Sequence, residues 1–394
     1  MESAMILDDA HDVLEVVADA PTPRRRRSPR VIVRVVLHNI ALVAEWIFGA
    51  VALILGLAIL AALPVAQFLS MGYFLESSAR VARSGRLRDG IIGVRRAARV
   101  GGLVAGAWLS TLPLWLAGSF ARSADLIDPG GTTAAGWRAF LAVMVVLTFL
   151  HIGMACMRGA RLRHFLIPFG NPFWLRRRLR DGSLYSEARD GLCDFLASLR
   201  LPRYFRIGLI GFIGTLSWLI VPAVLISSGG KFPLLGIIGV ILLAVIVPFL
   251  PFLQVRYAVE GRISVFYSRR AIRDRFRRAP WAFAFALFVL LLASIPLYLL
   301  KIEMIPREAA WLPGLVFVLF LAPARLLIGW AYSRSGRRDL PRHWFFRYLG
   351  RLAIVLAALF YVMVVFFAQY TSWGGLWSLY EQHAFLLPVP FLRM

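Results

Sequence analysis

The stretch Trp281–Leu300, WAFAFALFVLLLASIPLYLL, decides the fold class of this chain. It contains no Asp, Glu, Lys or Arg, and its length is close to the ~20 residues with which a helix crosses ~30 Å of hydrocarbon. Arg277 and Arg278 precede it, and Lys301 follows it. The stretch therefore predicts a membrane-spanning helix.

Seven further apolar runs of similar length surround this one. They are Ile40–Leu63, Gly102–Phe120, Ala139–Met157, Ile207–Ile226, Pro233–Leu253, Trp311–Tyr332 and Leu352–Gln369. Only one acidic residue, Glu45, lies inside any of the runs. The chain is 59% hydrophobic and only 17% charged, against about 25% charged residues in soluble domains. We predict an all-α polytopic transmembrane bundle of about eight spans, in the range of about seven to nine.

The net charge of +24 is concentrated in the connections between these runs. Four connections are rich in arginine: Arg80–Arg99, Arg158–Arg206, Arg256–Arg278 and Arg334–Arg351. The positive-inside rule assigns such connections to the cytoplasm, and the intervening connections carry little positive charge. No nucleic-acid recognition motif accompanies the charge, so nucleic acid is not an expected partner. The C-terminus is predicted to face outward and the N-terminus to be cytoplasmic.

The first run conflicts with this alternation. The arginines at 24–34 and the arginines at 80–99 should both be cytoplasmic, but a single crossing at Ile40–Leu63 would separate them. Either the N-terminus is outside, or the segment Val35–Glu76 forms a hairpin that bends near Gly49, Gly56 or Pro64. Because membrane helices tolerate breaks at Pro and Gly when other helices cover them, we favour the hairpin.

The runs and the charge divide the chain into five segments. Residues 1–34 are expected to form a disordered cytoplasmic tail, 35–165 a first transmembrane half and 166–206 a basic cytoplasmic loop. Residues 207–338 are expected to form a second transmembrane half, and 339–394 the last span with an outward interfacial tail. The two cysteines, Cys156 and Cys193, form neither a metal-ligand spacing nor a disulfide framework.

A faint internal repeat relates the two halves. Leu63-Pro64-Val65-Ala66-Gln67 is similar to Leu250-Pro251-Phe252-Leu253-Gln254, and a later span carries Pro113 in one half and Pro296 in the other. Trp137 and Trp311 then open a third element, each followed fourteen positions later by an ionisable residue, His151 or Arg325. This order predicts a parallel duplication of a kind common in transporters.

The segment Met71-Gly72-Tyr73-Phe74-Leu75, followed by Arg80, Arg83 and Gly85, resembles uncharacterised multi-pass membrane families of bacteria. These families are known only as domains of unknown function. The resemblance covers about thirty residues. It implies a bacterial inner-membrane protein and brings no activity with it.

The ionisable side chains inside the runs and the two glutamines of the repeat are the candidate site residues, because burying polar groups in a bilayer is costly. We select His151, Arg325, Glu45, Gln67 and Gln254 as residues that could bind a substrate or a lipid. Glu45 is the expected ion-pair partner of Arg325 if the N-terminus is cytoplasmic. A polar cavity lined by the other four would indicate a transporter, whereas solid packing or contact with headgroups would argue against one. Gly208, Gly211 and Gly214 are expected to allow close helix packing.

No catalytic motif is present. The sequence has no phosphate-binding Gly-rich loop, His-Glu-x-x-His or Gly-x-Ser-x-Gly, so we expect no catalytic residue, cofactor or metal. Three functions stay open: a lipid-interacting or accessory membrane component, a permease for a small or anionic solute, and a membrane-embedded lipid-modifying enzyme. The expected partners are membrane lipids with anionic headgroups on the cytoplasmic side, and other membrane proteins.

Overall fold

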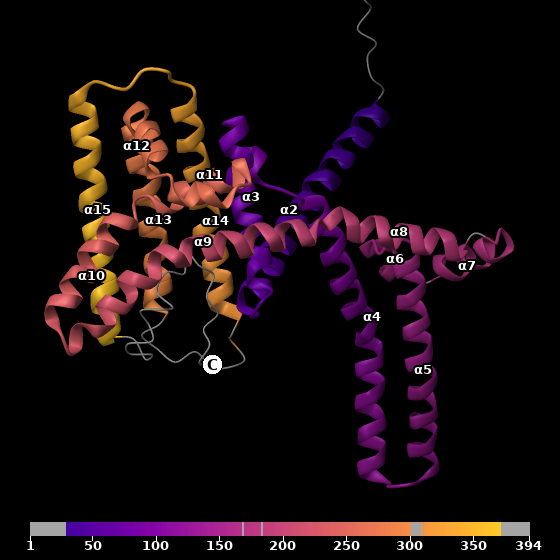
Figure 1. Ribbon diagram of the computed structural model, residues 1–394. Helices are drawn as coiled ribbons and strands as arrows, with labels where there is room; N and C mark the ends of the chain where they lie inside the picture. Colours follow the sequence, from indigo (N-terminus) through magenta and orange to yellow (C-terminus); the bar gives the residue numbers. More distant parts are fainter. Residues whose placement is uncertain (1–28, 168, 183, 301–308, 310, 372–394) are drawn as a thin grey trace, which may run out of the picture. The chain divides into compact units, whose positions relative to one another are not determined.

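A computed structural model describes residues 29–371 except 168, 183, 301–308 and 310. These residues form helices and connections, with no strand among them (Figure 1). The α-helices are α2 (Pro29–Ala62), α3 (Gln67–Ser84), α4 (Val94–Ile127), α5 (Thr132–Met157), α6 (Leu162–Leu166), α7 (Gly170–Arg180), α8 (Leu184–Leu199), α9 (Leu201–Ser227), α10 (Pro233–Ile246), α11 (Leu250–Glu260), α12 (Arg269–Arg278), α13 (Pro280–Leu299), α14 (Trp311–Gly336) and α15 (Trp344–Thr371). Three 3-10 turns connect them: η1 (Leu87–Gly90), η2 (Ser228–Gly230) and η3 (Ile263–Tyr267).

Each of the eight apolar runs is helical. Among the described residues, seven helices are long and apolar enough to cross a membrane by themselves. The bent pair of α10 and α11 becomes an eighth candidate if it counts as one span. Their axes differ by 46°. The bend falls at Val247–Phe249, where Pro248 supplies no backbone N–H and Pro251 opens the next helix. The predicted all-α polytopic bundle is confirmed.

Two segment boundaries differ from expectation. The described part of α2 starts at Pro29, inside the segment 1–34 that was expected to be a disordered tail. Residues 166–206 were expected to be a loop, but α7 and α8 lie within them. Apolar runs mark the part of a helix that membrane can cover and do not report the polar turns beyond it. Residues 1–28 and 372–394 lie outside the described residues.

The chain divides into two units, Met1–Glu45 and Trp46–Met394. Of the first unit, the structure describes the N-terminal part of α2. All contacts given below lie within the second unit.

A helical hairpin joins the rest of α2 to α3. The break falls at Leu63–Ala66, and Val65 adopts a left-handed backbone conformation with φ of +66°. Across the break, the Ser70 hydroxyl donates a hydrogen bond of 2.9 Å to the Leu57 carbonyl oxygen. The chain thus turns back at Pro64, one of the positions at which the predicted hairpin could bend.

Helix α3 packs closely against α9, α14 and α11. A Cβ on Gly72 would lie 1.8 Å from the Tyr204 carbonyl oxygen, and one on Gly208 would lie 1.9 Å from the Phe68 carbonyl oxygen. Gly211 and Gly214 are also buried, against Leu75 and Phe266. The packing role expected for these α9 glycines is confirmed.

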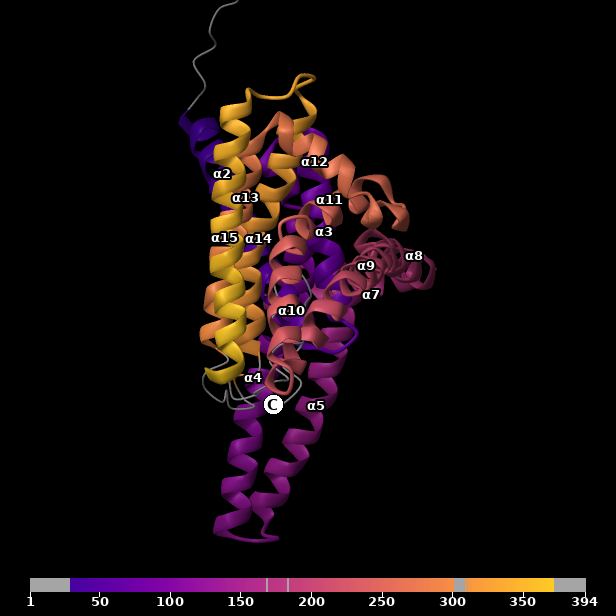
Figure 2. The same ribbon diagram turned by 60° about the vertical axis from the view of Figure 1, so that its left-hand side comes forward.

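On the other side of α14, helix α13 lies next to both α14 and α15, and the three run alongside one another in both ribbon views (Figure 2). Buried leucines, alanines and phenylalanines of α13 and α14 form much of the apolar core.

The predicted repeat has partial counterparts in the helices. Helices α3 and α11 both follow a break near a proline, and both end at a left-handed glycine, Gly85 or Gly261, with φ of +74°. However, α3 has 18 residues and α11 has 11, so aligning the prolines and aligning the end caps gives two different registers. The duplication stays a prediction.

Candidate functional site

Arg325 lies in a buried polar chain between α14, α11 and α9. Its guanidinium donates a hydrogen bond to Gln254 Oε1, and Gln254 Nε2 donates to Thr215 Oγ1 at 2.6 Å. Both Gln254 and Thr215 are fully buried. The Ser78 hydroxyl donates to the backbone oxygen of Arg325 at 2.9 Å and ties the same turn of α14 to α3. Two of the five predicted site residues, Arg325 and Gln254, are therefore in direct contact.

Gln67 and Glu45 are placed elsewhere. Gln67 is buried at the start of α3, and its Oε1 has no hydrogen-bond partner among the described residues. Glu45 is exposed and belongs to the first unit, so its expected pairing with Arg325 stays a prediction.

His151 belongs to a separate polar cluster formed by α5, α6 and α7. His151 Nε2 donates to the Phe165 carbonyl oxygen at 2.9 Å, and the buried Asn171 side chain donates to His151 Nδ1 at 3.4 Å. Asn171 also donates to the His164 carbonyl oxygen at 2.8 Å and accepts from Arg158 at 3.1 Å. These contacts tie the short helices α6 and α7 to the end of α5, which is a structural role.

His164 adds a second imidazole to this cluster. Burial, followed by the charges of three neighbouring arginines, lowers the pKa of His164. Those arginines are Arg158, Arg163 and Arg161.

Glu76 is a buried carboxylate on α3 that binds arginines of two helices. Arg203 of α9 lies 3.1 Å away, and Arg80 and Arg83 of α3 each lie 3.5 Å away. The carboxylate is saturated by these partners, which suits an anchor between α3 and α9. Within the described part of the chain, no group of His, Cys, Asp and Glu is arranged to hold a metal ion.

Two cavities lie between α10 and α15, and we call them together the α10–α15 groove. One chamber, of about 660 Å³, is lined by Val240, Ile241, Ala244, Val245, Pro248, Phe249, Ile272, Arg273, Phe276, Arg277, Phe283, Arg351, Ile354, Val355, Ala358 and Leu359. The other, of about 750 Å³, is lined by Ile226, Gly229, Gly230, Pro233, Gly236, Ile237, Val240, Leu359, Val362, Met363, Phe366 and Tyr370. The chambers share Val240 and Leu359 and so lie next to each other.

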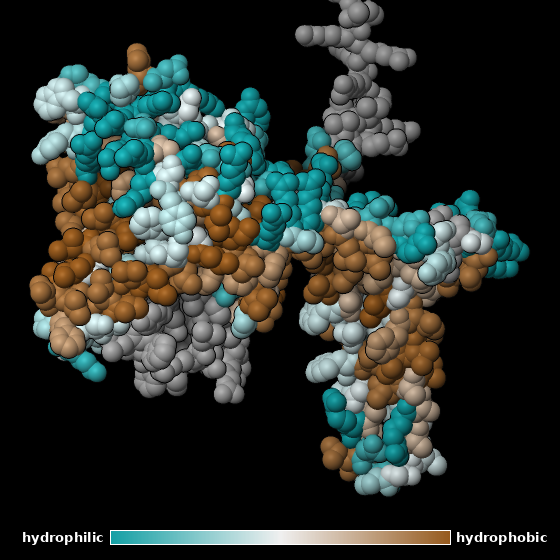
Figure 3. Space-filling model, viewed as in Figure 1, coloured by the Kyte–Doolittle hydropathy of each residue, from teal (hydrophilic) through white to brown (hydrophobic). Residues whose placement is uncertain are grey.

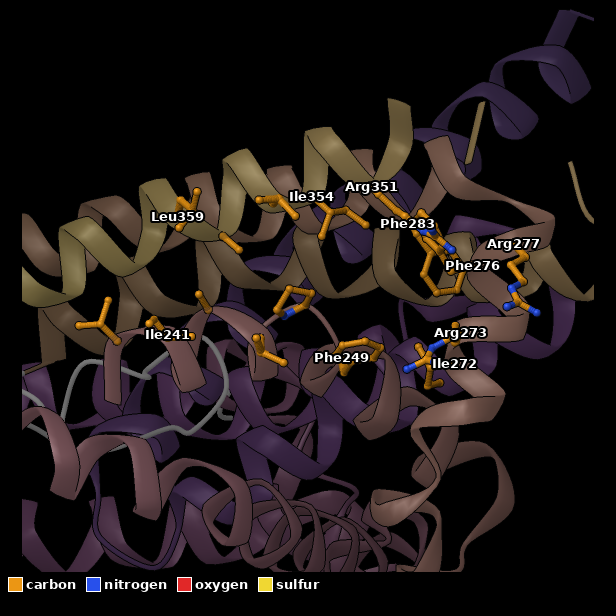
Figure 4. Close-up of a pocket in the computed structure, with 16 residues that line it drawn as sticks. Ile241, Phe249, Ile272, Arg273, Phe276, Arg277, Phe283, Arg351, Ile354 and Leu359 are labelled. Carbon is orange, nitrogen blue, oxygen red and sulfur yellow. The ribbon is translucent and has the colours of Figure 1, made fainter. Parts of the chain in front are cut away.

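Three arginines, Arg273, Arg277 and Arg351, lie at one end of the groove, away from Ile241 and Leu359 (Figure 4). Arg277 forms an ion pair of 3.5 Å with the exposed Asp274, and its Nε is buried without a hydrogen-bond partner among the described residues. Among the described residues, the side chains of Arg273 and Arg351 form no ion pair and no hydrogen bond. This end of the groove carries excess positive charge.

Contacts between aromatic rings stabilise the part of the groove lining next to these arginines. Phe283 stacks on Phe252 with ring centroids 4.1 Å apart and meets the edge of Phe276 at 6.1 Å. Beyond them the lining is apolar, and its outer residues are about half exposed: Ile241 by 58%, Val355 by 51% and Leu359 by 52%. Figure 3 shows hydrophilic surface over α12 and apolar surface over α10. The groove can therefore hold a hydrocarbon chain with an anionic group at one end.

In the sequence, these arginines were recognisable only as part of the expected cytoplasmic charge. A local signal was present in α12, where Ile272 and Phe276 are four residues apart and both buried. Arg273 and Arg277 follow them with the same spacing, which puts both arginines on one side of the helix. No local pattern pointed to Arg351, because only the tertiary packing brings α15 and α12 to the same cavity.

Comparison of the chain with protein-family models, curated proteins and solved structures found no match. The helices and their composition define the class as a multi-pass α-helical membrane protein. Function within that class has to be inferred from the chain's own side chains.

Proposed function

We propose that this protein binds an anionic phospholipid in the α10–α15 groove, in the cytoplasmic leaflet of a bacterial inner membrane. The acyl chain lies along α10 and α15, and the phosphate contacts Arg273, Arg277 and Arg351. The observation that carries the proposal is that these three arginines line the same end of an apolar groove.

Physical chemistry supports this occupant over an uncharged one. Guanidinium binds phosphate with two parallel hydrogen bonds, which are stronger than bonds between neutral groups. Anionic headgroups also concentrate near basic cytoplasmic segments. Because Arg273 and Arg351 come from segments expected to be cytoplasmic, the headgroup would lie at that interface. The inner-membrane assignment follows the resemblance noted around Met71.

The test measures retained lipid by native mass spectrometry after purification in mild detergent with phosphatidylglycerol and phosphatidylcholine present. The double variant Arg273→Gln/Arg351→Gln should bind phosphatidylglycerol at least about tenfold more weakly, since lost charge-assisted hydrogen bonds cost about 1.5–3 kcal/mol each. Ala244→Phe should also reduce retention, because its ring fills the groove without changing the charge.

A matched control is Arg262→Gln/Arg270→Gln. Both arginines are exposed, lie outside the groove and have no side-chain partner among the described residues. The control should retain phosphatidylglycerol like the unaltered protein. Equal retention of both lipids by the unaltered protein, or full retention by the Arg273/Arg351 variant, would refute the proposal.

Transport of an anionic solute is the second candidate function. The 46° break between α10 and α11 and the buried contact between Arg325 and Gln254 resemble the broken helices and polar side chains that line transporter sites. Uptake of labelled inorganic phosphate into proteoliposomes that is lost in Arg325→Met would favour this candidate. Absence of uptake together with specific phosphatidylglycerol binding would favour the first.

A further inference from the structure

A second cavity lies where α3 and α14 end, and it is distinct from the groove. It has a volume of about 160 Å³ and is lined by Gly85, Trp330, Ser333, Arg334, Arg337 and Arg338. The volume is less than a quarter of that of the basic chamber of the groove, so it suits a small group and not a whole lipid.

Glycine at position 85 makes this cavity possible. Its φ of +74° ends α3, and a Cβ there would lie 1.8 Å from Arg337 Nη2 and 3.0 Å from Ser333 Oγ. Ser333 is buried, with 8% of its surface exposed, and its hydroxyl has no hydrogen bond to any described residue. A free hydroxyl therefore lies beside the arginines.

The three arginines hold more positive charge than their surroundings offset. Arg337 donates to the Ser84 carbonyl oxygen at 3.1 Å, and Arg334 lies over the Trp330 ring at 5.5 Å. No carboxylate lines the cavity, and none of the three has an ion pair within the described residues. Two helix C-termini together contribute about one negative charge, at roughly half a charge each, against three guanidiniums.

We infer that this cavity binds a phosphate group, either inorganic phosphate or the phosphomonoester headgroup of a lipid. Arg334 and Arg338 contact its oxygens as charged donors, and the Ser333 hydroxyl donates a further hydrogen bond. Arg337 adds a third positive charge beside the site. A dianion offsets the repulsion among the guanidiniums and accepts a hydrogen bond from the Ser333 hydroxyl. This site is independent of the lipid groove.

The experiment follows thermal unfolding of the purified protein in neutral detergent as inorganic phosphate replaces chloride at constant ionic strength. Phosphate also stabilises proteins nonspecifically, so the informative quantity is the difference between variants. The double variant Arg334→Gln/Arg338→Gln should lose the site-specific rise in midpoint, and Ser333→Ala should weaken it severalfold. The control Arg95→Gln/Arg99→Gln has the same net charge, and its two positions are exposed.

A second arm places the same proteins in phosphatidylcholine nanodiscs with or without phosphatidic acid. Stabilisation by phosphatidic acid that the Arg334/Arg338 variant loses, without any response to free phosphate, assigns the lipid headgroup as the source. If that variant loses the response to both probes, free phosphate is sufficient. The inference is overturned if the Arg334/Arg338 variant responds to both probes like the control. It is also overturned if the unaltered protein responds to neither. The groove variant Arg273→Gln/Arg351→Gln should keep the response to free phosphate, which separates failure of this site from failure of the groove.

Discussion

Arg325 shows how one charged side chain is accommodated inside the bundle. Its guanidinium contacts Gln254, which is held in turn by Thr215. We expect Gln254→Met to lower the unfolding free energy by about 1.5–3 kcal/mol, because it removes the acceptor of a charged hydrogen bond. Arg325→Met should cost a similar amount, and the double variant should lose less than the sum, as measured by thermal unfolding in detergent.

The same cycle with Glu45→Leu tests the pairing expected from the sequence. Coupling between Arg325 and Glu45 would establish that ion pair in addition to the Gln254 contact. Additive losses would rule it out. Additive losses in the Arg325 and Gln254 cycle would instead show that this hydrogen bond contributes little to stability.

At the scale of elements, the contact between α3 and α9 depends on the absence of side chains at Gly72 and Gly208. Gly72→Ala should lower the apparent melting temperature and cost about 1–3 kcal/mol, because its Cβ would meet the Tyr204 carbonyl oxygen and force the helices apart. Circular dichroism of the purified protein during heating measures this.

Gly56 of α2 provides the matched control. A Cβ there meets nothing within 4 Å. Since alanine is favoured over glycine inside a helix by about 0.5–1 kcal/mol, Gly56→Ala should leave the protein unchanged or slightly more stable. Equal destabilisation by both substitutions would contradict the close-packing explanation.

For the whole molecule, the hairpin at Pro64 and the basic segments lead to one prediction of topology. An alkaline phosphatase fused after Met394 should be active, because α15 crosses the membrane after the basic segment Arg334–Arg351. A fluorescent protein fused at the N-terminus should be fluorescent if, as the basic segments predict, the hairpin starts and ends on the cytoplasmic side.

Phosphatase fused after Pro341, within the basic segment, is the control and should be inactive. An inactive C-terminal phosphatase fusion that becomes fluorescent with a cytoplasmic reporter would reverse the topology. A dark N-terminal reporter would favour the alternative in which the N-terminus is outside.

Local sequence patterns identified the helices but few of the contacts between them. Gly208, Gly211 and Gly214 were recognisable as packing positions because their spacing puts them near one another on α9. The contact between Arg325 and Gln254 was not recognisable, since these residues are 71 positions apart and no periodicity links them. His151 and Arg325 are equivalent in the predicted repeat, but their hydrogen bonds lie in separate clusters.

The sequence by itself determined that the chain is an all-helical membrane protein, because the thickness of the hydrocarbon layer requires a length of apolar helix that can be read directly from the residues. Only the tertiary structure decided where charge meets apolar surface. Arg273 and Arg351 lie on helices joined through two others, and the space between α10 and α15 exists only when those helices pack. A groove forms where the side chains of neighbouring helices leave space between them. No single segment of sequence specifies that space, because it depends on helices that are far apart in the chain.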